Sequence, residues 1–528
     1  MSEESFQIKS RSNANAILLL LFIIAFILRF YKTDSYPYQI NVDEISNIYD
    51  GYSILETGAD RHGNESPILL YGFGAGDNRT AAYAWVCAAS FKLFGVSITN
   101  GRLPSAFFGI LSLFILFLAA DKIGGRTFAL LSLFAGTLLP WHILFSRMAL
   151  EGSMLPPLFI ILILWMWIVL KEKGFNPYYL FLVALVCGVS TNAYPSSRVS
   201  GAIAMLLIYI DLLKHKKGSF KNHLLIGAGF CLGAFPQLFI ALTAQKDYLS
   251  RAHDTMIPFS FSPGYFMKVG QYLCSNLFPK YLFFDFGSPN NLTIARLLFA
   301  EALFFYPGLL FINRYASKSS FFRPWMLYIL FMATILPAAL TTANPHALRA
   351  SGSMMFMPLF IASGMLWICN LPKNRGAKKT LLALSITAIA VNGGINLKQY
   401  VNSSELRDAG QQHILVKMAE KVNQLQSSYN RIYIDDGFNQ PYIYVAWYCG
   451  IKPGLFQKMP KEVFHQSDHF DKITAMGKFY FIPDSISGQV ASAIAGNTLM
   501  VMRTRPASAS ILDSVSLNNR SLYFYEIK

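Results

Sequence analysis

Charged residues are scarce in this sequence. Lysine, arginine, aspartate and glutamate make up 14% of its 528 residues, whereas a soluble protein of this length has about 25%. Apolar residues make up 53%, and several apolar runs reach the roughly 18–20 residues that cross the hydrocarbon core of a bilayer. The shortage of charge excludes an ordinary soluble enzyme and predicts a polytopic α-helical membrane protein.

Cysteine is also rare, and its positions lack a pattern. The six cysteines have no paired spacing, and Cys187, Cys231 and Cys369 lie inside apolar runs. This excludes a disulfide framework and a cysteine zinc site. No small-residue cleavage site follows the first apolar run, so we interpret that run as an uncleaved anchor rather than a signal peptide. The sequence also contains no internal repeat and no low-complexity segment.

Basic residues give the apolar runs a direction, because cytoplasmic loops of membrane proteins are rich in lysine and arginine. With the N-terminus inside, the three short external loops hold only Arg147, Arg198 and Arg349 among the basic residues. The net charge of +16 is therefore interpreted as cytoplasmic loops that face anionic lipid, and no nucleic-acid partner is predicted. About 11–13 transmembrane helices are expected. Eleven spans are predicted at residues 14–30, 103–120, 127–145, 154–170, 178–194, 197–213, 223–243, 297–313, 324–341, 351–369 and 380–397.

One short apolar run, "TAAYAWVCAASFKLFG" at residues 80–95, tests this orientation. Counting it as a twelfth span would invert every later loop and place the lysine-rich segments outside. Because it is short and carries Lys92, we predict a juxtamembrane helix that lies against the outer surface. Residues 31–102 then form one large external loop, and residues 244–296 form a second.

The composition changes after the last apolar run. Residues 400–528 are mixed polar and apolar, with helical patterning around 405–426. Strand-like runs lie at residues 431–436, 478–483, 498–504 and 521–527. The odd number of spans places this part on the side opposite the N-terminus. The prediction is a transmembrane domain of residues 1–399 with two large external loops, followed by a soluble extracytoplasmic α/β domain.

The predicted topology gathers the charged motifs at the outer face. Ionisable residues at such depths are costly, and they point to function. A carboxylate can take a proton from a hydroxyl group, and arginines can bind a departing phosphate, so the pattern favours transfer from a phosphate-linked donor. The motifs contain Asp43 and Glu44 in "NVDE", Asp77 and Arg79 in "GDNRT", Arg102 in "GRLPSA", Arg147 and Glu151 in "SRMALEGS", Arg198 in "YPSSR", and His346 and Arg349 in "NPHALRA".

These segments resemble the GT-C glycosyltransferases, in particular the family of the protein O-mannosyltransferases and the aminoarabinose transferase of lipid A. The resemblance spans roughly residues 15–400 and rests on "VDE", "YGFGAGDNRTAAYAWVCAASFKLFG", "GRLPSAFFGILSLFILFLAADKIGG", "PWHILFSRMALEGS" and "NPHALRA" in the expected order. It implies a GT-C fold in the plasma (inner) membrane of a bacterial cell envelope. It also implies hexosyl or pentosyl transfer from a polyprenyl-phosphate sugar to a hydroxyl group of a lipid, glycan or protein.

The resemblance implies roles for individual residues. Asp43 is the expected catalytic base, and Glu44 is expected to position the acceptor or a partner charge. Arg79 stands where family members commonly have the lysine of a Lys-Pro-Pro-Leu-like stretch, although the two prolines are missing here. The expected reaction is a single displacement with inversion, in which polyprenyl phosphate leaves with its charge held by basic residues. The expected donor-phosphate ligands are Arg79, Arg102, Arg147, Arg198, His346 and Arg349.

Most of these residues also fit a structural role. Asp43 and Glu44 suit the first turn of a helix, where acids are favoured. Arg147 and Glu151 have the spacing of a helical ion pair. Arg102 could simply anchor a span at the membrane interface. The residues alone leave both interpretations open.

The first loop also contains metal-ligand types, at Asp60, His62 and Glu65. A polar external loop explains them, so neither a metal site nor a cofactor is predicted; a divalent cation is left open because some relatives use one. The alternative function is a transporter or flippase of a lipid-linked or anionic substrate. Charges collected at one face and the lack of repeats favour the enzyme, while an inactive relative that serves as a binding scaffold is a third interpretation.

Overall fold

The chain divides into two compact units. Unit 1 comprises Met1–Thr33, Arg102–Gln245 and Thr255–Asn402, and unit 2 comprises Asp34–Gly101, Lys246–Asp254 and Ser403–Lys528. Unit 2 thus combines most of the predicted first external loop with the C-terminal residues. The computed structural model describes residues 11–38, 40–74, 77–284, 295–316, 323–402, 412–465, 470–493, 496–505, 510–517 and 520–527.

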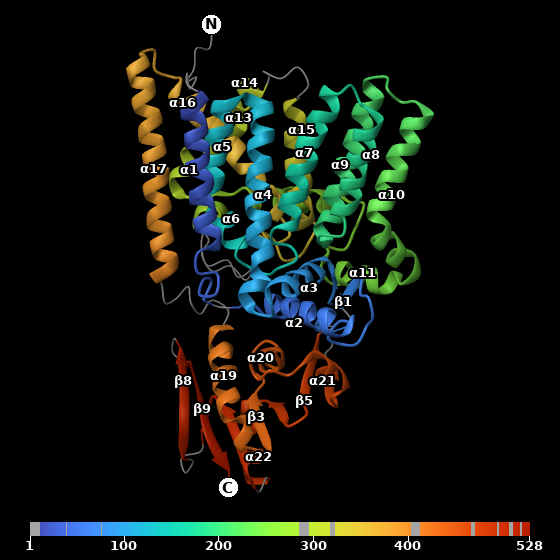
Figure 1. Ribbon diagram of the computed structural model, residues 1–528, viewed down its shortest axis with the longest axis vertical. Coiled ribbons are helices and arrows are strands. Elements are labelled where there is room, and N and C mark those ends of the chain that lie inside the picture. Colours follow the sequence, from blue (N-terminus) through green and yellow to red (C-terminus); the bar gives the residue numbers. More distant parts are fainter. Residues whose placement is uncertain are drawn as a thin grey trace. The chain divides into compact units, whose positions relative to one another are not determined.

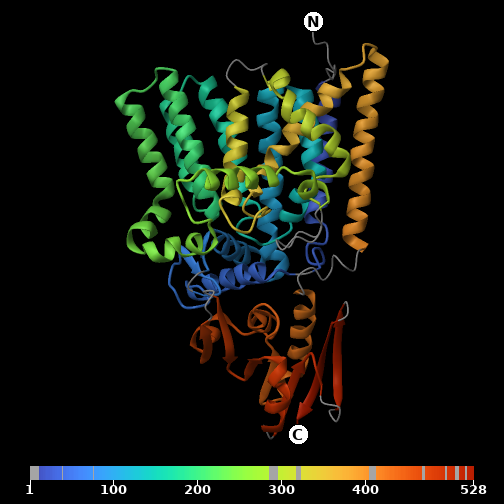
Figure 2. The same cartoon turned by 180° about the vertical axis from the view of Figure 1, so that it is seen from behind.

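Unit 1 is a bundle of apolar helices (Figures 1 and 2). Among the described helices, seven are long and apolar enough to cross a membrane, and the protein is accordingly a multi-pass membrane protein. In both views α17 lies at the margin of the bundle. The seven are α1 (Arg11–Phe30), α4 (Ile98–Gly124), α7 (Leu155–Glu172), α9 (Pro195–Lys214), α10 (Phe220–Thr243), α17 (Arg375–Asn402), and Ser351–Cys369, formed by η3 (Ser351–Met355) and α16 (Met357–Cys369).

Shorter apolar helices occupy the four remaining predicted spans, so each of the eleven predicted runs is confirmed as helical. The predicted span 127–145 is nevertheless two helices rather than one. Its first helix ends at Leu138, and Leu139 is extended, because a residue before proline avoids the helical conformation and Pro140 has no N–H to continue the ladder. The helices are α5 (Arg126–Leu138), α6 (Pro140–Phe145), α8 (Pro177–Ser190), α13 (Ala302–Phe311) preceded by η2 (Phe299–Glu301), and α15 (Pro324–Ala339); α14 (Asn313–Ala316) follows α13.

The predicted second loop, residues 244–296, contains helices of its own. They are α11 (Gln245–Thr255), α12 (Pro263–Ser275) and one π-helical turn, η1 (Lys280–Phe284). Serine begins α12 through its side chain, because Ser262 Oγ accepts the Tyr265 N–H at 3.3 Å. Residues 285–294 lie outside the described part of the chain.

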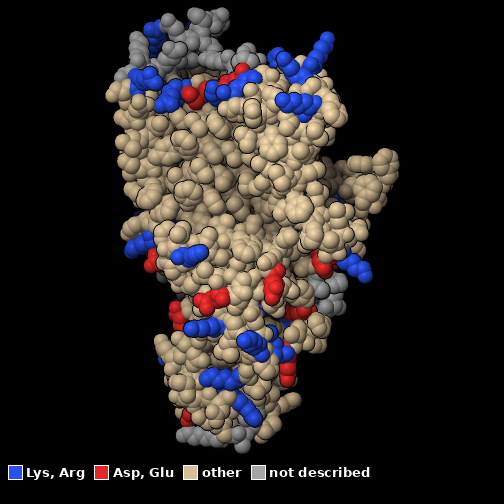
Figure 3. Space-filling view, turned by 45° about the vertical axis from the view of Figure 1, so that its right-hand side comes forward, with Lys and Arg blue, Asp and Glu red and all other residues tan. Residues whose placement is uncertain are grey.

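Basic side chains gather at one end of the helical bundle, beside a broad surface band that is nearly free of charge on the face drawn in Figure 3. The helix ends that the sequence predicts to be cytoplasmic carry basic residues. Lys122 lies in the last turn of α4, Lys214 ends α9 and Arg375 begins α17. An apolar band bordered by lysine and arginine is the surface that a bilayer with anionic headgroups requires.

Glycine allows a close backbone contact within the bundle, between α8 and α10. A Cβ atom at Gly233 would lie 2.3 Å from the Leu185 carbonyl oxygen, and one at Gly188 would lie 2.3 Å from the Phe230 carbonyl oxygen. The two backbones therefore pack directly on each other. Such contacts stabilise membrane helices because lipid supplies no hydrophobic force between them.

In unit 2 the first-loop residues form a helix pair and a small hairpin. The elements are α2 (Val42–Thr57), β1 (Leu69–Tyr71), β2 (Asn78–Thr80) and α3 (Ala82–Phe94), which confirms the helix predicted at 80–95. The hairpin is antiparallel, with Leu70 opposite Arg79. Gly51 lets α2 approach α3, since a Cβ atom there would lie 2.5 Å from Cys87 Cβ. This packing holds α2 directly against α3.

The C-terminal part of unit 2 is an α/β domain built on a seven-stranded sheet of order β4-β5-β6-β3-β7-β9-β8. Its central strand, β3, runs parallel to β6 and β7, and the other pairs are antiparallel. The strands are β3 (Arg431–Asp435), β4 (Lys461–His465), β5 (Asp471–Met476), β6 (Phe479–Ile482), β7 (Thr498–Met502), β8 (Ile511–Leu517) and β9 (Arg520–Ile527). The helices are α19 (Gln412–Leu425), η4 (Gln426–Ser428), α20 (Pro441–Tyr448), α21 (Pro453–Lys458), η5 (Asp484–Ile486) and α22 (Ser487–Ala493).

The four strands predicted from sequence are confirmed as β3, β6, β7 and β9. The prediction missed β4, β5 and β8. Strands β4 and β8 lie at the two edges of the sheet and are mostly exposed. An edge strand with one or no buried face lacks the apolar alternation from which strands are recognised.

Substitution of Gly233 by alanine tests the backbone contact between α8 and α10. We expect Gly233→Ala to lower the free energy of unfolding by about 1–3 kcal/mol, because the added methyl group must push two backbones apart. The control is Gly227→Ala in the same helix, where a Cβ atom would meet nothing within 4 Å. The measurement is the thermal unfolding midpoint of the purified protein in detergent; equal midpoints for the two variants would contradict the packing described.

Candidate active site

The predicted acidic pair lies at the start of α2, and the helix cap explains its local geometry. Asn41 is the N-cap residue, and its side chain accepts the Asp43 N–H at 2.7 Å. The Glu44 carboxylate accepts the Asn41 N–H at 3.4 Å and so completes a capping box. Glu44 is fully buried, whereas the Asp43 side chain is 34% exposed. The cap therefore uses Glu44 and presents Asp43.

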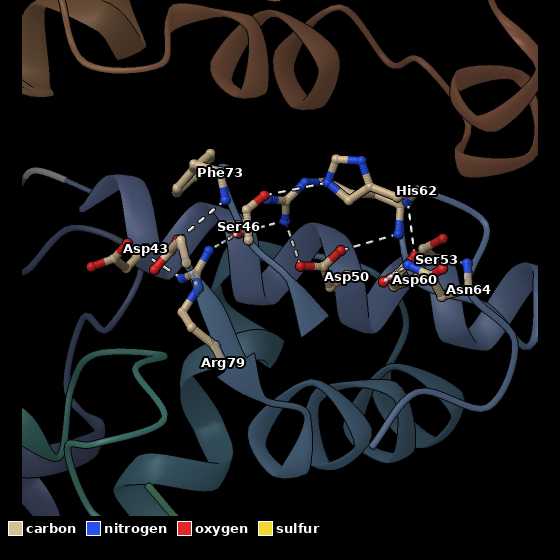
Figure 4. A network of polar contacts seen from close by, with 12 residues as sticks. Asp43, Ser46, Asp50, Ser53, Asp60, His62, Asn64, Phe73 and Arg79 are labelled. Atoms are coloured by element: carbon tan, nitrogen blue, oxygen red, sulfur yellow. Dashed lines mark hydrogen bonds and ion pairs between the residues drawn. The ribbon is translucent and has the colours of Figure 1, made fainter. Parts of the chain in front are cut away.

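Asp43 faces Arg79 of β2 (Figure 4). Asp43 Oδ1 lies 3.3 Å from Arg79 Nη1, and Arg79 Nη2 donates to Ser46 Oγ at 2.9 Å. On its other side, Arg79 Nε lies 3.3 Å from Asp77 Oδ2. Arg79 is fully buried. The structure thus brings together two residues that the sequence predicts for the site, the candidate base and one candidate phosphate ligand.

A second buried arginine lies next to this pair. Arg61 Nη1 is 2.5 Å from Asp50 Oδ2 and also donates to Ser46 Oγ at 2.5 Å, and the Arg61 backbone N–H donates to Asp50 Oδ1 at 3.1 Å. Burial raises the pKa of the Asp50 carboxyl, although the nearby Arg61 guanidinium acts to lower it. Burial acts to lower the pKa of Arg61, but the Asp50 carboxylate raises it. The backbone N–H and the guanidinium both stabilise the charged form of the carboxylate.

The two guanidinium groups share one aromatic ring. The Arg61 and Arg79 guanidinium carbons each lie 5.0 Å from the centroid of the Phe73 ring. The backbone next to this ring is tightly packed, since a Cβ atom at Gly72 would lie 2.3 Å from Asp77 Oδ2. Glycine is therefore required at position 72 for Asp77 to reach Arg79.

The first-loop residues whose types can bind metals have hydrogen-bond partners nearby. Asp60 accepts the backbone N–H groups of His62 and Asn64 at 2.9 and 3.0 Å, and the Asn64 side chain at 2.9 Å. These bonds are the reason for an aspartate in this turn. Within the described residues, no group of three or more His, Cys, Asp or Glu side chains could hold a metal ion.

His62 is held in a neutral environment. Its ring lies against Tyr71, with 5.2 Å between centroids, and Nε2 is 3.3 Å from the Gly72 carbonyl oxygen. Burial, followed by repulsion from Arg61, lowers the pKa of His62 to about 3. The neutral imidazole donates to the Gly72 carbonyl and so supports the strand that precedes Phe73.

Two of the predicted phosphate ligands in unit 1 bind the end of α1. Arg102 Nη1 donates to the Thr33 carbonyl oxygen at 2.8 Å, and both residues are buried. Arg147 donates to carbonyl oxygens at the C-terminus of the same helix, where a cation is favoured. Its acceptors are Leu28, Tyr31 and Lys32, at 2.9, 2.7 and 3.0 Å. Arg147 thus caps the C-terminus of α1, Arg102 binds the chain just after it, and phosphate binding by either arginine stays a prediction.

The remaining predicted ligands are half-buried. Arg198 lies in the first turn of α9, and the Arg349 backbone N–H donates to His346 Nδ1 at 3.4 Å. Arg147 and Glu151 do not share a helix, since α6 ends at Phe145 and α7 begins at Leu155. The helical ion pair considered for Arg147 and Glu151 therefore does not apply.

Three members of the network in unit 2 were missed from sequence, namely Ser46, Asp50 and Arg61. Asp43, Ser46 and Asp50 follow the spacing of one helix face, and Figure 4 shows them along one side of α2. That spacing was the available signal for Ser46 and Asp50. No local pattern indicates Arg61, because its partners become neighbours only when the loop folds back on α2.

Unit 1 contains another polar group that the sequence did not indicate. Arg29, fully buried in α1, has Nη2 2.9 Å from His142 Nδ1, and His142 Nε2 lies 3.0 Å from Ser112 Oγ. His142 is also fully buried among these contacts. The chain joins α1, α4 and α6 inside the bundle.

Solved structures identify the fold. ArnT from Cupriavidus metallidurans bound to undecaprenyl phosphate superposes with a TM-score of 0.54 and 11% sequence identity, over 97% of each chain. Apo ArnT gives 0.52 and 12%, again over 97% of each chain. The oligosaccharyltransferase from Archaeoglobus fulgidus covers 83% of this chain and 64% of its own at 11% identity, but its TM-score of 0.43 is too low to bear on the fold.

The chain therefore has the GT-C fold, with a helical membrane part and a C-terminal sheet domain, as predicted. Residues 78–240 match the family described as dolichyl-phosphate-mannose-protein mannosyltransferase. The predicted fold is thereby confirmed, and the chain resembles this family over the matched segment. The matched segment includes Arg79 and begins after Asp43. No curated protein matches the sequence significantly.

The low pKa of His62 predicts a pH dependence of stability. An unfolded chain protonates this histidine near pH 6.5, whereas the folded chain protonates it only near pH 3. Stability is therefore complete above pH 6.5 and is lost as the pH falls below it. Between pH 7.5 and 5.5 we expect wild type to lose about 1 kcal/mol relative to His62→Gln, since one pKa unit corresponds to about 1.4 kcal/mol.

The measurement is the thermal unfolding midpoint at pH 7.5, 6.5 and 5.5. His253→Gln serves as the control, because the His253 side chain is 90% exposed. Parallel pH profiles for wild type and both variants would show that His62 is not held neutral.

Proposed function

We propose that the protein is an inverting glycosyltransferase that moves a sugar from a polyprenyl-phosphate donor to a hydroxyl acceptor on a lipid, glycan or protein. The observation that carries the proposal is the pair of Asp43, a partly exposed carboxylate, and Arg79, a buried guanidinium 3.3 Å away. The undecaprenyl phosphate bound to ArnT supports a polyprenyl-phosphate donor. The fold and the family match do not favour a transporter.

Asp43 is proposed as the general base. About a third of its side chain is exposed, so an acceptor hydroxyl can reach it. As the hydroxyl oxygen attacks the anomeric carbon, its proton passes to the carboxylate. The bond from that carbon to the phosphate oxygen breaks on the opposite face, which inverts the configuration and releases polyprenyl phosphate.

Arg79 is proposed to link proton transfer to departure of the phosphate. Its guanidinium is balanced by Asp43 and Asp77 before the reaction. When Asp43 takes the proton it becomes neutral, and its attraction for Arg79 falls at the moment when negative charge grows on the leaving phosphate. The charge of Arg79 then stabilises the leaving group, and its burial strengthens that interaction by excluding water.

The other proposed phosphate ligands are Arg102, Arg147, Arg198, His346 and Arg349. Arg198, His346 and Arg349 are half-buried, which suits a direct contact with a lipid-linked phosphate. Arg102 and Arg147 are buried and donate to carbonyl oxygens near the end of α1. They are therefore proposed to attract the phosphate through their positive potential rather than to contact it directly. Glu44 is proposed to hold the start of α2, which carries Asp43, through its bond to Asn41.

The proposal includes the orientation. The N-terminus is assigned to the cytoplasm and the site to the outer face of the plasma membrane, because the basic helix ends collect at one end of the bundle. The proposed domains are a transmembrane domain of residues 1–399, with external loops 31–102 and 244–296, and an extracytoplasmic domain of 400–528.

Asp43→Asn tests the proposed base. The amide keeps the size of the side chain but cannot accept the proton, so we expect transfer to fall roughly 10²–10⁴-fold. Purified protein in vesicles is given undecaprenyl phosphate linked to radiolabelled sugars, with host membranes as the source of acceptor, and label in product is counted. The control is Glu56→Gln, an exposed carboxylate on the same helix. Transfer by Asp43→Asn at the wild-type rate would rule out Asp43 as the base.

Reporter fusions test the orientation. Alkaline phosphatase is active only outside the cytoplasm, so we expect activity when it follows Lys528 and none when it follows Lys217, after α9. A fluorescent protein that folds only in the cytoplasm should give the opposite pattern at the same positions. Phosphatase activity after Lys217 would reverse the proposed topology.

A further inference from the structure

The C-terminal α/β domain contacts the first-loop helix α2 through side chains on α20 and α21. The Tyr444 hydroxyl donates to the Ile40 carbonyl oxygen at 2.9 Å. Gln457 Nε2 donates to Ser53 Oγ at 3.0 Å, and the Tyr49 hydroxyl of α2 donates to the Ile451 carbonyl oxygen at 2.7 Å. All of these residues belong to unit 2. The domain is thus attached along the helix whose first turn carries Asp43.

The same domain also holds Phe73, the residue between β1 and β2 whose ring lies against both arginines. The Asp471 backbone N–H, at the start of β5, donates to the Phe73 carbonyl oxygen at 2.6 Å. The Tyr71 hydroxyl donates to Asp471 Oδ2 at 3.0 Å. The Phe73 ring also meets the Tyr442 ring of α20, with 6.2 Å between centroids in a T-shaped arrangement. Phe73 is therefore fixed through its backbone and its ring.

The contact with Phe73 is made from the end of the sheet at which the parallel strand β6 terminates. In α/β sheets, ligands usually bind at the carboxyl ends of the parallel strands, where the strand order reverses. Here β3 lies between β6 and β7 and runs parallel to both. The segment between β3 and α20 contacts the start of β5, because Gln440 Nε2 donates to the Asp471 carbonyl oxygen at 2.9 Å. Gln440 therefore supports Asp471, and Asp471 binds the loop that contains Phe73.

Phe73 connects the domain to the candidate base. Its backbone N–H donates to Asp77 Oδ2 at 3.1 Å, and the same oxygen lies 3.3 Å from Arg79 Nε. Its ring forms one wall for the Arg79 guanidinium at 5.0 Å. Arg79 then meets Asp43 at 3.3 Å. Each step from Asp471 to Asp43 is a direct contact.

We propose that the C-terminal domain positions the active site, with Phe73 as the positioning residue: Asp471 fixes Phe73, Phe73 fixes Arg79, and Arg79 fixes the Asp43 carboxylate. This inference rests on the proposed function for its catalytic consequence. The positioning itself is a structural claim that can be measured without substrate. Neither Phe73 nor Asp471 touches the reacting atoms in this scheme.

Phe73→Leu tests the aromatic step in the full-length protein. Leucine keeps an apolar side chain but removes the ring, so we expect amide hydrogen exchange at residues 77–80 to become about tenfold faster. Transfer should show kcat lowered about tenfold to a hundredfold with KM nearly unchanged, because a misplaced catalytic group slows chemistry more than binding. Phe73→Tyr keeps the ring and is expected to restore both values to near wild type. Equal losses in the leucine and tyrosine variants would overturn the role of the ring.

A pair of variants at Asp471 tests the contribution of the domain. Asp471→Pro removes the backbone N–H that donates to the Phe73 carbonyl oxygen. Proline is tolerated at the first residue of a strand. Asp471→Ala removes the side chain and keeps that N–H. We expect Asp471→Pro to raise hydrogen exchange at residues 77–80 about tenfold and Asp471→Ala to raise it less, while exchange in β3 and β7 stays at the wild-type rate and shows that the domain is folded. Unchanged exchange at 77–80 in Asp471→Pro would overturn the proposal.

The two readouts separate this inference from the proposed function. Faster exchange at 77–80 in Phe73→Leu and Asp471→Pro, together with no sugar transfer by wild type, would support the positioning and reject the proposed reaction. Normal transfer by wild type with unchanged exchange in both variants would reject the positioning alone. Tyr429→Phe, which removes a hydroxyl that contacts Glu526 elsewhere in the same domain, is the control and should leave both readouts unchanged.

Discussion

The burial of two guanidinium groups side by side is the constraint on which the candidate site depends. Arg61 and Arg79 are both fully buried, and a buried charge is costly unless it is paired and hydrogen-bonded. The loop meets this cost with carboxylates on both sides and with Ser46, which accepts from both arginines at 2.5 and 2.9 Å. Asp43 belongs to this arrangement and is its partly exposed member. A residue required to neutralise an arginine is thereby also presented to an incoming hydroxyl.

The same physical rule governs the membrane part, where polar groups have no water to bind. Arg29 of α1 contacts His142 and the Gly136 carbonyl oxygen. Arg147 donates to carbonyl oxygens at the end of α1 that have no partner within the helix. Glycine lets backbones touch where bulk would separate them, as at Gly233. Fixed helix ends matter because they carry the residues proposed to face the donor phosphate.

The C-terminal domain supports the candidate site, which the first loop does not hold in place alone. Three hydroxyl and amide contacts hold α2 and the residue before its N-cap, and one backbone hydrogen bond holds Phe73. A short loop with few partners would open easily, since local stability follows local contacts. Bonding it to a folded α/β domain raises its order without adding a residue to the reacting centre, which is consistent with a site in which Asp43 and Arg79 must stay within hydrogen-bond reach.

The sequence by itself determined the class of protein, because apolar length, basic helix ends and motif order are local properties. It also determined Asp43 and Arg79 as candidates, since their residue types suit the chemistry, and it located the strands β3, β6, β7 and β9 of the sheet. Only the tertiary structure decided which charges meet: Arg79 pairs with a residue 36 positions earlier, Arg61 enters the site with no local signal, and Arg147 caps a helix. Pairing of this kind depends on contacts between distant segments, which periodicity and spacing along the chain do not encode.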